Sequence, residues 1–342
     1  MIAPFHADSL QASTKAKLVA MADIRKDLAD TAAAKYGCKS YGSLDGLLSD
    51  DEVQVVSVLL PNHLHKEPVV MAAEAGRHVL VEKPPSMSLS ETDDMIQASR
   101  ENNVKLAVVL QCRMRKPVQA MKKALAEGRY GQLYQADTVL KWWRTQEYYK
   151  SAGWRCLQRS GAGVTIQHAF HYIDLLQYLA GPAKRVWARM ENIAHPAAEL
   201  EDTLTALVEY ESGARGLVQA STAFWPGQDL RIELCGEKGA STMVGERTTL
   251  WQFQDERPED EEIRHYGSAA VQTGASSPTA LSFKDHQMVI EDLADSIKED
   301  REPLISAPSV RPTLEIALAM YLSARVQDWV ELPLDSKINI WE

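Results

Sequence analysis

A lysine stands where it could assist proton transfer, in the segment EKPP at residues 82–85, directly after a short apolar run at 78–81. An ammonium group at a strand end can hydrogen-bond a substrate hydroxyl and lower the pKa of that hydroxyl before hydride leaves the carbon. The two prolines restrict the backbone around Lys83, which argues against an ordinary surface position. We identify Lys83 as a candidate catalytic residue of an alcohol oxidation, with a surface charge as the alternative.

A second group of polar residues lies on one face of a predicted helix, which follows small residues at 160–163. Gln167, His171 and Asp174 are four and then three residues apart, so a helix places them in one stripe among apolar side chains. Buried polar groups need partners, and the stripe is either a structural network or a surface that faces substrate. Because imidazole titrates near neutral pH, we favour His171 as an acid/base group, with Gln167 and Asp174 as substrate ligands.

Two further polar segments end predicted strands. The sequence PNHLH at 61–65 follows the β-branched run 53–60, at the strand end where α/β sheets bind ligands. Its two histidines could indicate a metal, but no carboxylate or thiol is near them in sequence, and we expect no metal site. Asp23, near the end of the run 17–24, could accept hydrogen bonds from the adenosine ribose, which favours NAD. Arg25 could instead contact a 2′-phosphate, so NADP stays open.

Strands and helices alternate in the first third of the chain. Continuous apolar runs such as 53–60 are typical of strands that are buried on both faces of a parallel sheet. The predicted strands are 17–24, 53–60, 78–81 and 105–110, and the predicted helices are 27–36, 66–75 and 90–102. This pattern predicts an α/β, Rossmann-like domain with a doubly wound parallel sheet at residues 1–120.

The pattern changes after about residue 128, where strands follow one another without long helices between them. The predicted strands are 133–143, 185–192, 203–210, 214–223, 230–235 and 248–253, with a hairpin turn at 211–213. Amphipathic helices are predicted at 283–298 and 309–327, and the acidic, Ser/Gly-rich segment 255–280 is predicted to be a loop. We expect a second, α+β domain at 121–342 with an open, mostly antiparallel sheet, whose C-terminal helices pack back toward the first domain.

The chain opens on a predicted helix at residues 2–13. A dinucleotide-binding domain normally begins with a strand and a GxGxxG turn, which seats the pyrophosphate on a helix N-terminus. Here Ala3 would occupy the third glycine position, next to Ile2, and the two earlier glycines are absent. We expect that the sequence has been shortened and has lost this strand. A fold that never had the strand is the alternative.

Length, charge and cysteines limit the classes of function. A chain of 342 residues favours two domains, because single hydrophobic cores rarely grow that large. A net charge of −10 argues against binding to nucleic acid or to acidic membranes, and we expect neither partner. The four cysteines are far apart without a CxxC pair, and neither a membrane span nor a signal peptide is visible. We expect a cytoplasmic protein with free thiols.

The motifs occur in an order that resembles one family. The segments PNHLH, HVLVEKP, QCRMRKP, and WR followed by SGAGVTIQHAFHYIDLL are similar to those of the Gfo/Idh/MocA family, named after glucose–fructose oxidoreductase and inositol dehydrogenase. The similarity extends from residue 2 to about residue 334, and the combination of motifs makes it specific. It implies an NAD(P)-dependent oxidoreductase that transfers hydride between nicotinamide and the CH–OH carbon of a sugar, sugar derivative or cyclitol.

The resemblance also implies roles for residues. Lys83 matches the family's catalytic lysine and His171 its acid/base histidine, and Gln167 stands where many members have an aspartate that could relay a proton. Lys83 and His171 would therefore share the proton transfer. The predicted substrate-binding residues are Gln111, Arg113, Gln167 and Asp174, and the predicted cofactor-binding residues are Ile2, Ala3, Asp23, Ile24, Pro61, Asn62, His65, Glu82, Trp154 and Arg155.

Two other functions stay open on the same scaffold. One is an NAD-dependent glycoside hydrolase, which oxidises its substrate transiently and then reduces it again. The other is a non-catalytic NAD(P)-binding regulatory protein, which the presence of both Lys83 and His171 argues against. Nucleotide-activated sugars are one substrate option, because Arg144, Arg155 and Arg159 could bind phosphate or carboxylate. The alternating strands leave one sheet face open, and we expect a homodimer or homotetramer through it.

Overall fold

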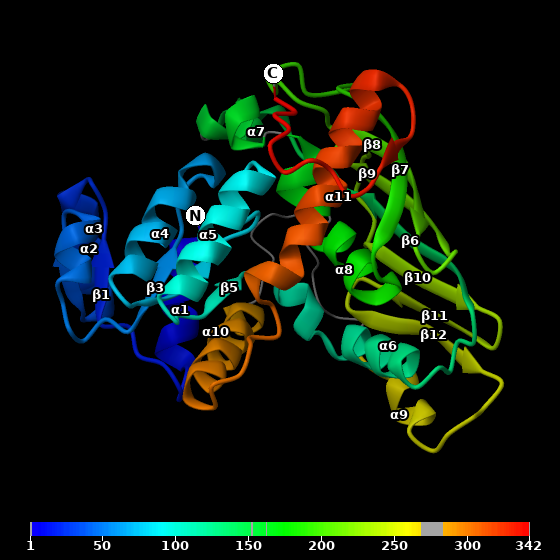
Figure 1. Cartoon of the computed structure of the whole chain (residues 1–342), viewed down its shortest axis with the longest axis horizontal. Coiled ribbons are helices and arrows are strands. Elements are labelled where there is room, and N and C mark those ends of the chain that lie inside the picture. Colours follow the sequence, from blue (N-terminus) through cyan, green and yellow to red (C-terminus); the bar gives the residue numbers. More distant parts are fainter. Residues whose placement is uncertain (1, 152, 162, 268–282, 342) are drawn as a thin grey trace. The chain divides into compact units, whose positions relative to one another are not determined.

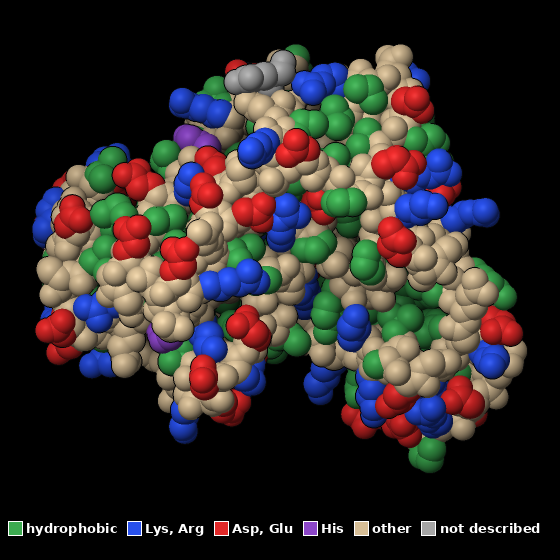
Figure 2. Space-filling model, viewed as in Figure 1, with side chains coloured by type: hydrophobic (Ala, Val, Ile, Leu, Met, Phe, Trp, Pro, Cys, Tyr) green, Lys and Arg blue, Asp and Glu red, His purple; other side chains and the backbone are tan. Residues whose placement is uncertain are grey.

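The computed structural model describes residues 2–151, 153–161, 163–267 and 283–341 (Figure 1). The chain divides into two compact units, of which the first comprises residues 1–111 and 282–310 and the second residues 112–281 and 311–342. No helix that the structure describes is both long and apolar enough to cross a membrane. On the face shown in Figure 2, acidic and basic side chains are interspersed, and neither sign gathers into one large area.

Parallel strands and helices alternate in the first unit, and the predicted Rossmann-like fold is confirmed. Val79, Leu80 and Val81 are almost fully buried because their strand, β4, is central, with β3 and β5 on its two sides. The strands are β1 (Ala20–Ala22), β2 (Lys39–Tyr41), β3 (Val55–Val58), β4 (His78–Val81) and β5 (Leu106–Val108). The helices are α1 (Ala3–Ala12), α2 (Lys26–Tyr36), α3 (Leu44–Leu48), α4 (Lys66–Glu74), α5 (Leu89–Glu101) and α10 (Phe283–Lys298).

Local sequence sets the ends of several of these helices. Ser43 caps α3 and Ser88 caps α5, each by accepting a backbone N–H of the first turn on its side chain. α2 ends at Gly37, which has a φ of 70° in the left-handed region that favours glycine. α2 and α5 therefore begin and end close to the predicted positions, whereas α3 was not predicted.

The parallel strands form two separate sheets. β1 pairs with β2, and β4 pairs with both β3 and β5, but no pairing joins β1 to β3 among the described residues. Interior strands of a parallel sheet are normally covered on both faces, whereas Val55 of β3 is 37% exposed and β1 is only partly covered. β1 and β3 therefore each present one free edge.

α1 and α10 are far apart in the sequence and pack together within the first unit. Ser9 Oγ donates a hydrogen bond to the carbonyl oxygen of Phe283 (2.7 Å), and Ser13 Oγ donates to Glu291 Oε1 (2.9 Å). Pro4 suits the first turn of α1, because the N–H that proline lacks would have no helical partner there. The helix predicted at residues 2–13 is confirmed, and α10 anchors it.

An eight-stranded sheet forms the second unit, and it is mostly antiparallel, as predicted. The strands lie in the order β12-β11-β10-β6-β9-β8-β7-β13, and β6 and β9 are the parallel pair among those described. The strands are β6 (Leu133–Lys141), β7 (Ala183–Glu191), β8 (Thr203–Tyr210), β9 (Arg215–Ser221), β10 (Arg231–Gly236), β11 (Gly239–Val244), β12 (Arg247–Phe253) and β13 (Val330–Glu331). The helices are α6 (Lys116–Ala126), α7 (Gln146–Lys150), α8 (Phe170–Ala180), α9 (Asp260–Arg264) and most of α11 (Ala307–Val326).

One face of this sheet is covered by helices. Ala136, Thr138 and Leu140 alternate along β6 and are buried, and α8 packs against this strand. Farther along the sheet, Ser323 Oγ of α11 accepts the backbone N–H of Ala188 in β7 at 2.9 Å. The covered face therefore places the helices of the second unit, including the one that carries His171.

The sequence pattern does not predict α6, α9 or β11. β11 has the mixed sequence GASTMV, which lacks a clean apolar alternation. α9 lies within the segment predicted to be a loop, and its Asp260 is held by Arg129 through two hydrogen bonds of 2.8 and 2.7 Å and by Trp251 Nε1 at 2.6 Å. These partners are distant in the sequence, so local propensity could not reveal the helix. Residues 268–280 of the predicted loop lie outside the described residues.

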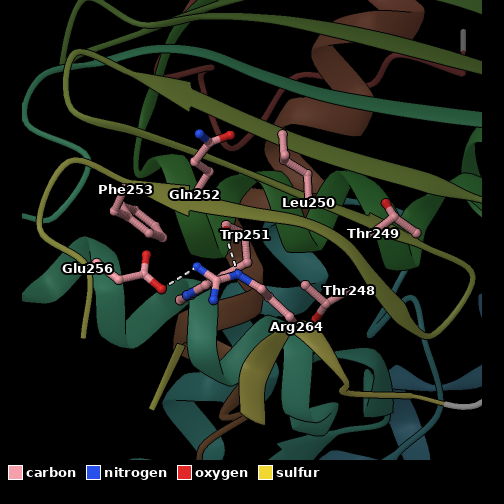
Figure 3. A pocket seen from close by; sticks show the side chains of 8 residues that line it. All are labelled: Thr248, Thr249, Leu250, Trp251, Gln252, Phe253, Glu256 and Arg264. Carbon is pink, nitrogen blue, oxygen red and sulfur yellow. Dashed lines mark hydrogen bonds and ion pairs between the residues drawn. The ribbon is translucent and has the colours of Figure 1, made fainter. Parts of the chain in front are cut away.

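A pocket of about 480 Å³ lies along β12 (Figure 3). Its lining comprises residues 248–253, Glu256 and Arg264, and Arg264 Nη2 binds Glu256 Oε1 at 2.5 Å. None of the predicted site residues lines this pocket.

Candidate functional site

Three predicted polar segments lie along one edge of the sheet β3-β4-β5 in the first unit. Residues 61–65 follow β3, Glu82 and Lys83 follow β4, and Gln111 follows β5. Because these strands are parallel and adjacent, their C-terminal ends share one edge, which is where α/β sheets bind ligands. Lys83 is partly exposed there, and Asn62 and Gln111 are buried. The fold thus gathers these residues as the sequence predicts.

His65 ties the first two of these segments together. Its buried ring places Nε2 2.8 Å from the carbonyl oxygen of Leu60, and Nδ1 3.0 Å and 3.3 Å from those of Pro84 and Pro85. Burial lowers the pKa of His65 despite the opposing effect of these carbonyls, so the imidazole is neutral and has one N–H to donate. Its single N–H can bond the carbonyl of Leu60 or a carbonyl of Pro84–Pro85, so the buried ring packs between the two segments and hydrogen-bonds one of them. The predicted cofactor contact of His65 stays a prediction.

Glu82 joins the same turn to α1 and α10. Its Oε1 lies 2.9 Å from His6 Nε2 and 4.0 Å from His286 Nε2, and its Oε2 accepts the backbone N–H of Lys83 at 3.2 Å. Burial by itself would raise the pKa of Glu82, but the hydrogen bond and charge of His6, with smaller effects of His286 and Lys83, hold that pKa below its ordinary value. Glu82 is therefore an ionised, mostly covered carboxylate.

His6, Glu82 and His286 are also the described residues whose ligand atoms could hold a metal ion, since these atoms lie within 4.8 Å of one another. Zinc bonds of about 2.0–2.2 Å in tetrahedral geometry would separate the ligand atoms by about 3.3 Å. The 2.9 Å contact between His6 and Glu82 is instead an ordinary hydrogen-bond length. We interpret the group as a hydrogen-bonded cluster. Sequence reasoning missed it because its members come from distant segments.

The predicted adenosine and pyrophosphate contacts lie at β1 and α1. Asp23 and Ile24 are exposed at the end of β1, and Asp23 Oδ1 accepts the backbone N–H of Arg25 at 2.8 Å. α1 begins at Ala3, directly after Ile2, and no side chain caps its first turn. A carboxylate at a strand end and uncapped N–H groups of a helix match the ribose and pyrophosphate of a dinucleotide. These residues therefore fit such a cofactor.

In the second unit, the helix that carries His171 begins with a π-helical turn, η5 (Thr165–Ala169), and continues as α8. The predicted straight helix, with Gln167, His171 and Asp174 in one stripe, is therefore wrong at its first turn, because a π turn is wider and shifts the register. Gln167 Nε2 donates to the carbonyl oxygen of Arg155 at 2.9 Å, whereas Asp174 binds Arg113. π turns often occur at functional sites.

Arg113 and Asp174 form a buried, two-point ion pair. Arg113 Nε donates to Asp174 Oδ2 at 2.7 Å, and Nη2 donates to Oδ1 at 2.6 Å, with both side chains 1% exposed. Thr313 Oγ1 of α11 donates to the same Oδ1 at 2.8 Å. Both carboxylate oxygens are thus engaged by the protein. We infer a structural role for the pair, and the predicted substrate contacts of Arg113 and Asp174 stay untested.

Trp154 and Arg155 lie in the short helix η3 (Gly153–Cys156), within an arginine–aromatic cluster. The buried guanidinium of Arg155 lies 4.7 Å from the ring centroid of Tyr148 and 5.4 Å from that of Trp154. The buried Arg144 lies 4.9 Å from the Trp142 ring and 5.6 Å from the Tyr148 ring. Guanidinium groups stacked on aromatic rings offer charge and flat surface together, which suits a polar, ring-shaped ligand.

Sequence reasoning identified the two arginines and Trp154 of this cluster, but not Trp142 or Tyr148. The signal was present in the run WWR at 142–144, since Arg144 stacks on Trp142 two residues earlier. Tyr148 could not be assigned in this way, because the turn of α7 that brings it between Arg144 and Arg155 has no strong local signature.

Comparison with known proteins adds independent findings. Residues 1–110 match a family model described as an oxidoreductase family with an NAD-binding Rossmann fold, and residues 118–242 match the GFO/IDH/MocA C-terminal domain. The structure is similar to the WlbA dehydrogenase of Chromobacterium violaceum, solved in complex with NADH and UDP-GlcNAcA, with a TM-score of 0.87 and 30% identity over 98% of this chain and 94% of that one.

Curated relatives are similar at lower identity. A levoglucosan dehydrogenase of Pseudarthrobacter phenanthrenivorans is 26% identical over 92% of this chain and 89% of its own length. A 2,7-anhydro-N-acetylneuraminate hydratase of Escherichia coli is 28% identical over 71% of this chain and 68% of its own length.

We predict that Asp174→Asn lowers the free energy of unfolding of the second unit by about 3–5 kcal/mol, because Arg113 would keep a buried charge without its counter-ion. Urea unfolding followed by circular dichroism measures the loss. Glu191→Gln is the matched control, since the exposed Arg189–Glu191 pair should contribute less than about 1 kcal/mol. A loss below about 1 kcal/mol in Asp174→Asn would contradict a structural role for the pair.

Proposed function

Because the chain belongs to the GFO/IDH/MocA family of oxidoreductases, we propose that it oxidises a hydroxyl-bearing carbon of a sugar, sugar derivative or cyclitol with a nicotinamide cofactor. The observation that carries the proposal is the placement of Lys83. It follows β4 at the ligand-binding edge of a parallel sheet, in a turn that His65 and Glu82 hold from two sides. An ammonium group fixed at that edge is suited to a substrate hydroxyl.

The first unit offers a fitting set of groups for NAD(P). Ile2 and Ala3 at the start of α1 would bind the pyrophosphate, and Asp23 the adenosine ribose, which favours NAD. Pro61, Asn62 and Glu82 lie at the sheet edge where the nicotinamide would be held. When bound, the cofactor supplies the hydride chemistry, and the protein supplies orientation and electrostatics. Free cysteines suit a reducing compartment, and we place the reaction in the cytoplasm.

Proton handling is assigned to Lys83 and His171. As the hydroxyl carbon loses hydride, its oxygen must lose a proton, and a lysine and an imidazole are both able to hydrogen-bond that oxygen or accept the proton. Gln167 lies on the π turn that precedes His171. Its amide can orient a substrate but cannot relay a proton. We therefore assign Gln167, together with Gln111, to substrate binding.

Two of the relatives and the second unit support a substrate class. The WlbA dehydrogenase is described with UDP-GlcNAcA and another relative is named for levoglucosan, and both ligands contain a sugar ring. Arg144 and Arg155, stacked on Tyr148, could receive a phosphate or carboxylate attached to such a ring. A nucleotide-linked sugar is therefore the first substrate to test.

A second candidate function is transient oxidation without net redox change. The relative from Escherichia coli is named a hydratase, so the same scaffold is used for a reaction whose name implies no oxidised product. Absorbance at 340 nm distinguishes the two functions, since only a dehydrogenase accumulates reduced cofactor with turnover. Product formation without a change in absorbance would favour the hydratase-like reaction.

We predict that Lys83→Ala lowers the turnover rate by about 10²–10⁴-fold, because the hydroxyl loses the group that assists its deprotonation. Cofactor binding, measured by fluorescence of reduced nicotinamide, should change little. Lys66→Ala removes a lysine of α4 that pairs with Asp94 and serves as the control. Near-parent turnover in Lys83→Ala would refute its catalytic role.

Replacing His171 with Ala is expected to remove a pH-dependent limb from the turnover profile between pH 5 and 8, because imidazole is a group that titrates in this range. The measurement is kcat and kcat/KM against pH for the parent and the variant. A profile of unchanged shape, with a rate within about threefold of the parent, would assign His171 a structural role instead.

We further propose that the open face of the eight-stranded sheet forms a subunit contact. Trp187, Leu207 and Leu217 stand opposite one another on β7, β8 and β9, and Leu207 is 44% exposed. Val218, the next residue of β9, is buried on the covered face. An apolar patch of this kind on a sheet favours association.

Light scattering should therefore show a dimer or tetramer at micromolar concentration. Leu207→Lys is expected to shift the protein toward monomer, because it places charge in the apolar contact. Leu28→Lys changes an exposed leucine of α2 in the first unit and should leave the mass unchanged. A parent protein that is a stable monomer would refute this proposal.

A further inference from the structure

A buried carboxyl group supports the π turn of the second unit. Glu201 Oε1 accepts hydrogen bonds from the backbone N–H of Thr165 (2.9 Å), from Thr165 Oγ1 (2.6 Å) and from the hydroxyl of Tyr321 in α11 (3.0 Å). The carbonyl oxygen of Glu201 also accepts the N–H of Val164 at 2.9 Å. Glu201 therefore holds the start of η5 by both its side chain and its backbone, and connects it to α11.

The second oxygen of this carboxyl has a different environment. Glu201 Oε2 is buried and has no hydrogen-bond partner among the described residues. It lies against Gly163, where an added Cβ atom would come within 2.1 Å of Oε2. A larger residue at this position would therefore displace the carboxyl group from its place. An ionised carboxylate would carry charge on an oxygen that these neighbours leave without a donor, which is costly in a buried site.

The protonation state follows from this burial. Burial raises the pKa of Glu201 to about 7, although the hydrogen bonds from Thr165 and Tyr321 work in the opposite direction. The titratable groups that act electrostatically in this cluster are Tyr321 from α11, Tyr149 from α7 and the adjacent Asp202. Each of these three is neutral or negative near pH 7, so none of them favours ionisation of Glu201. His195, whose pKa is raised despite burial by its hydrogen bond to Asp202, is the cationic neighbour, and it pairs with Asp202 at 2.8 Å rather than with Glu201.

We propose that Glu201 is a positioning residue, which holds the start of the helix that carries Gln167 and His171 and weakens its hold when it ionises. The two residues lie two and six positions after Thr165, on the continuous segment of η5 and α8. A shift of the first turn would therefore move both side chains. The catalytic consequence rests on the proposed function, since it requires that Gln167 or His171 act on substrate.

The direction in which pH changes the stability follows from the pKa of Glu201 in the folded and unfolded states. An unfolded glutamate ionises near its ordinary pKa of 4.5, whereas folded Glu201 ionises near 7, so the folded state retains the proton between these values. Stability is therefore highest below about pH 4.5 with respect to this group, decreases as the pH rises toward 7, and is constant above that. Glu201→Gln mimics the protonated form and removes this dependence.

The test compares the parent, Glu201→Gln and the control Glu211→Gln, which changes an exposed glutamate in the hairpin after β8. Hydrogen exchange at residues 165–171, corrected for the intrinsic pH dependence, should show protection that falls at least threefold from pH 6 to pH 8 in the parent and the control. In Glu201→Gln it should stay constant. The second measurement is the melting temperature of Glu201→Gln minus that of the parent. This difference should be roughly 3–6 °C larger at pH 8 than at pH 5.

The same pH dependence in Glu201→Gln as in the parent would overturn the proposal, as would protection that does not change with pH in the parent. These two measurements need no substrate, so they remain decisive if the proposed function fails. Where the parent oxidises UDP-GlcNAcA, levoglucosan or myo-inositol, kcat of Glu201→Gln should lose an inflection near pH 7 while KM changes less than about threefold. A kcat profile identical to the parent's would refute the catalytic consequence and leave the proposed function intact.

Discussion

The buried ion pair between Arg113 and Asp174 is the interaction on which the second unit's candidate site depends. Removing both charges from water costs several kcal/mol for each ion, and only close, two-point geometry with further hydrogen bonds can offset that cost. The structure meets this requirement, because Thr313 adds a third donor to the carboxylate. The pair thereby fixes α8 between α11 and the segment that follows β5. His171 lies three residues before Asp174 on α8, so the ion pair also positions His171.

In the first unit, a histidine and a glutamate hold the segment that carries the proposed catalytic residue. His65 holds the turn of Lys83 through backbone carbonyls, and Glu82 holds it through His6 and the N–H of Lys83 itself. In each unit the residue proposed to meet substrate is thus partly exposed, while hydrogen-bonded neighbours with little or no exposure hold the segment that carries it. Such support is what keeps a reactive group within the narrow range of geometry that catalysis requires.

Much of the fold follows from short-range patterns in the sequence. The run 53–60, the strand at 78–81 and the hairpin around 211–213 have the apolar content and turn residues of their elements, and the structure places strands there. The sequence could not show the π turn at Thr165–Ala169, because its register depends on Glu201, which lies far along the chain. Long-range partners also account for the cluster around Glu82. The order of the motifs identified the candidate residues. Tertiary contacts are needed to distinguish the residues that support the site from the residues that could contact a ligand.

The free edges of β1 and β3 have a consequence for the behaviour of the protein at high concentration. An edge strand presents a row of unpaired N–H and C=O groups, and these groups can template a strand from another molecule. Ala20–Ala22 and Val55–Val58 are short and largely uncharged, so neither edge carries the lysine or proline residues that usually block such pairing. The shortness of both strands limits how many hydrogen bonds an added strand could form, so length rather than charge is what protects these two edges.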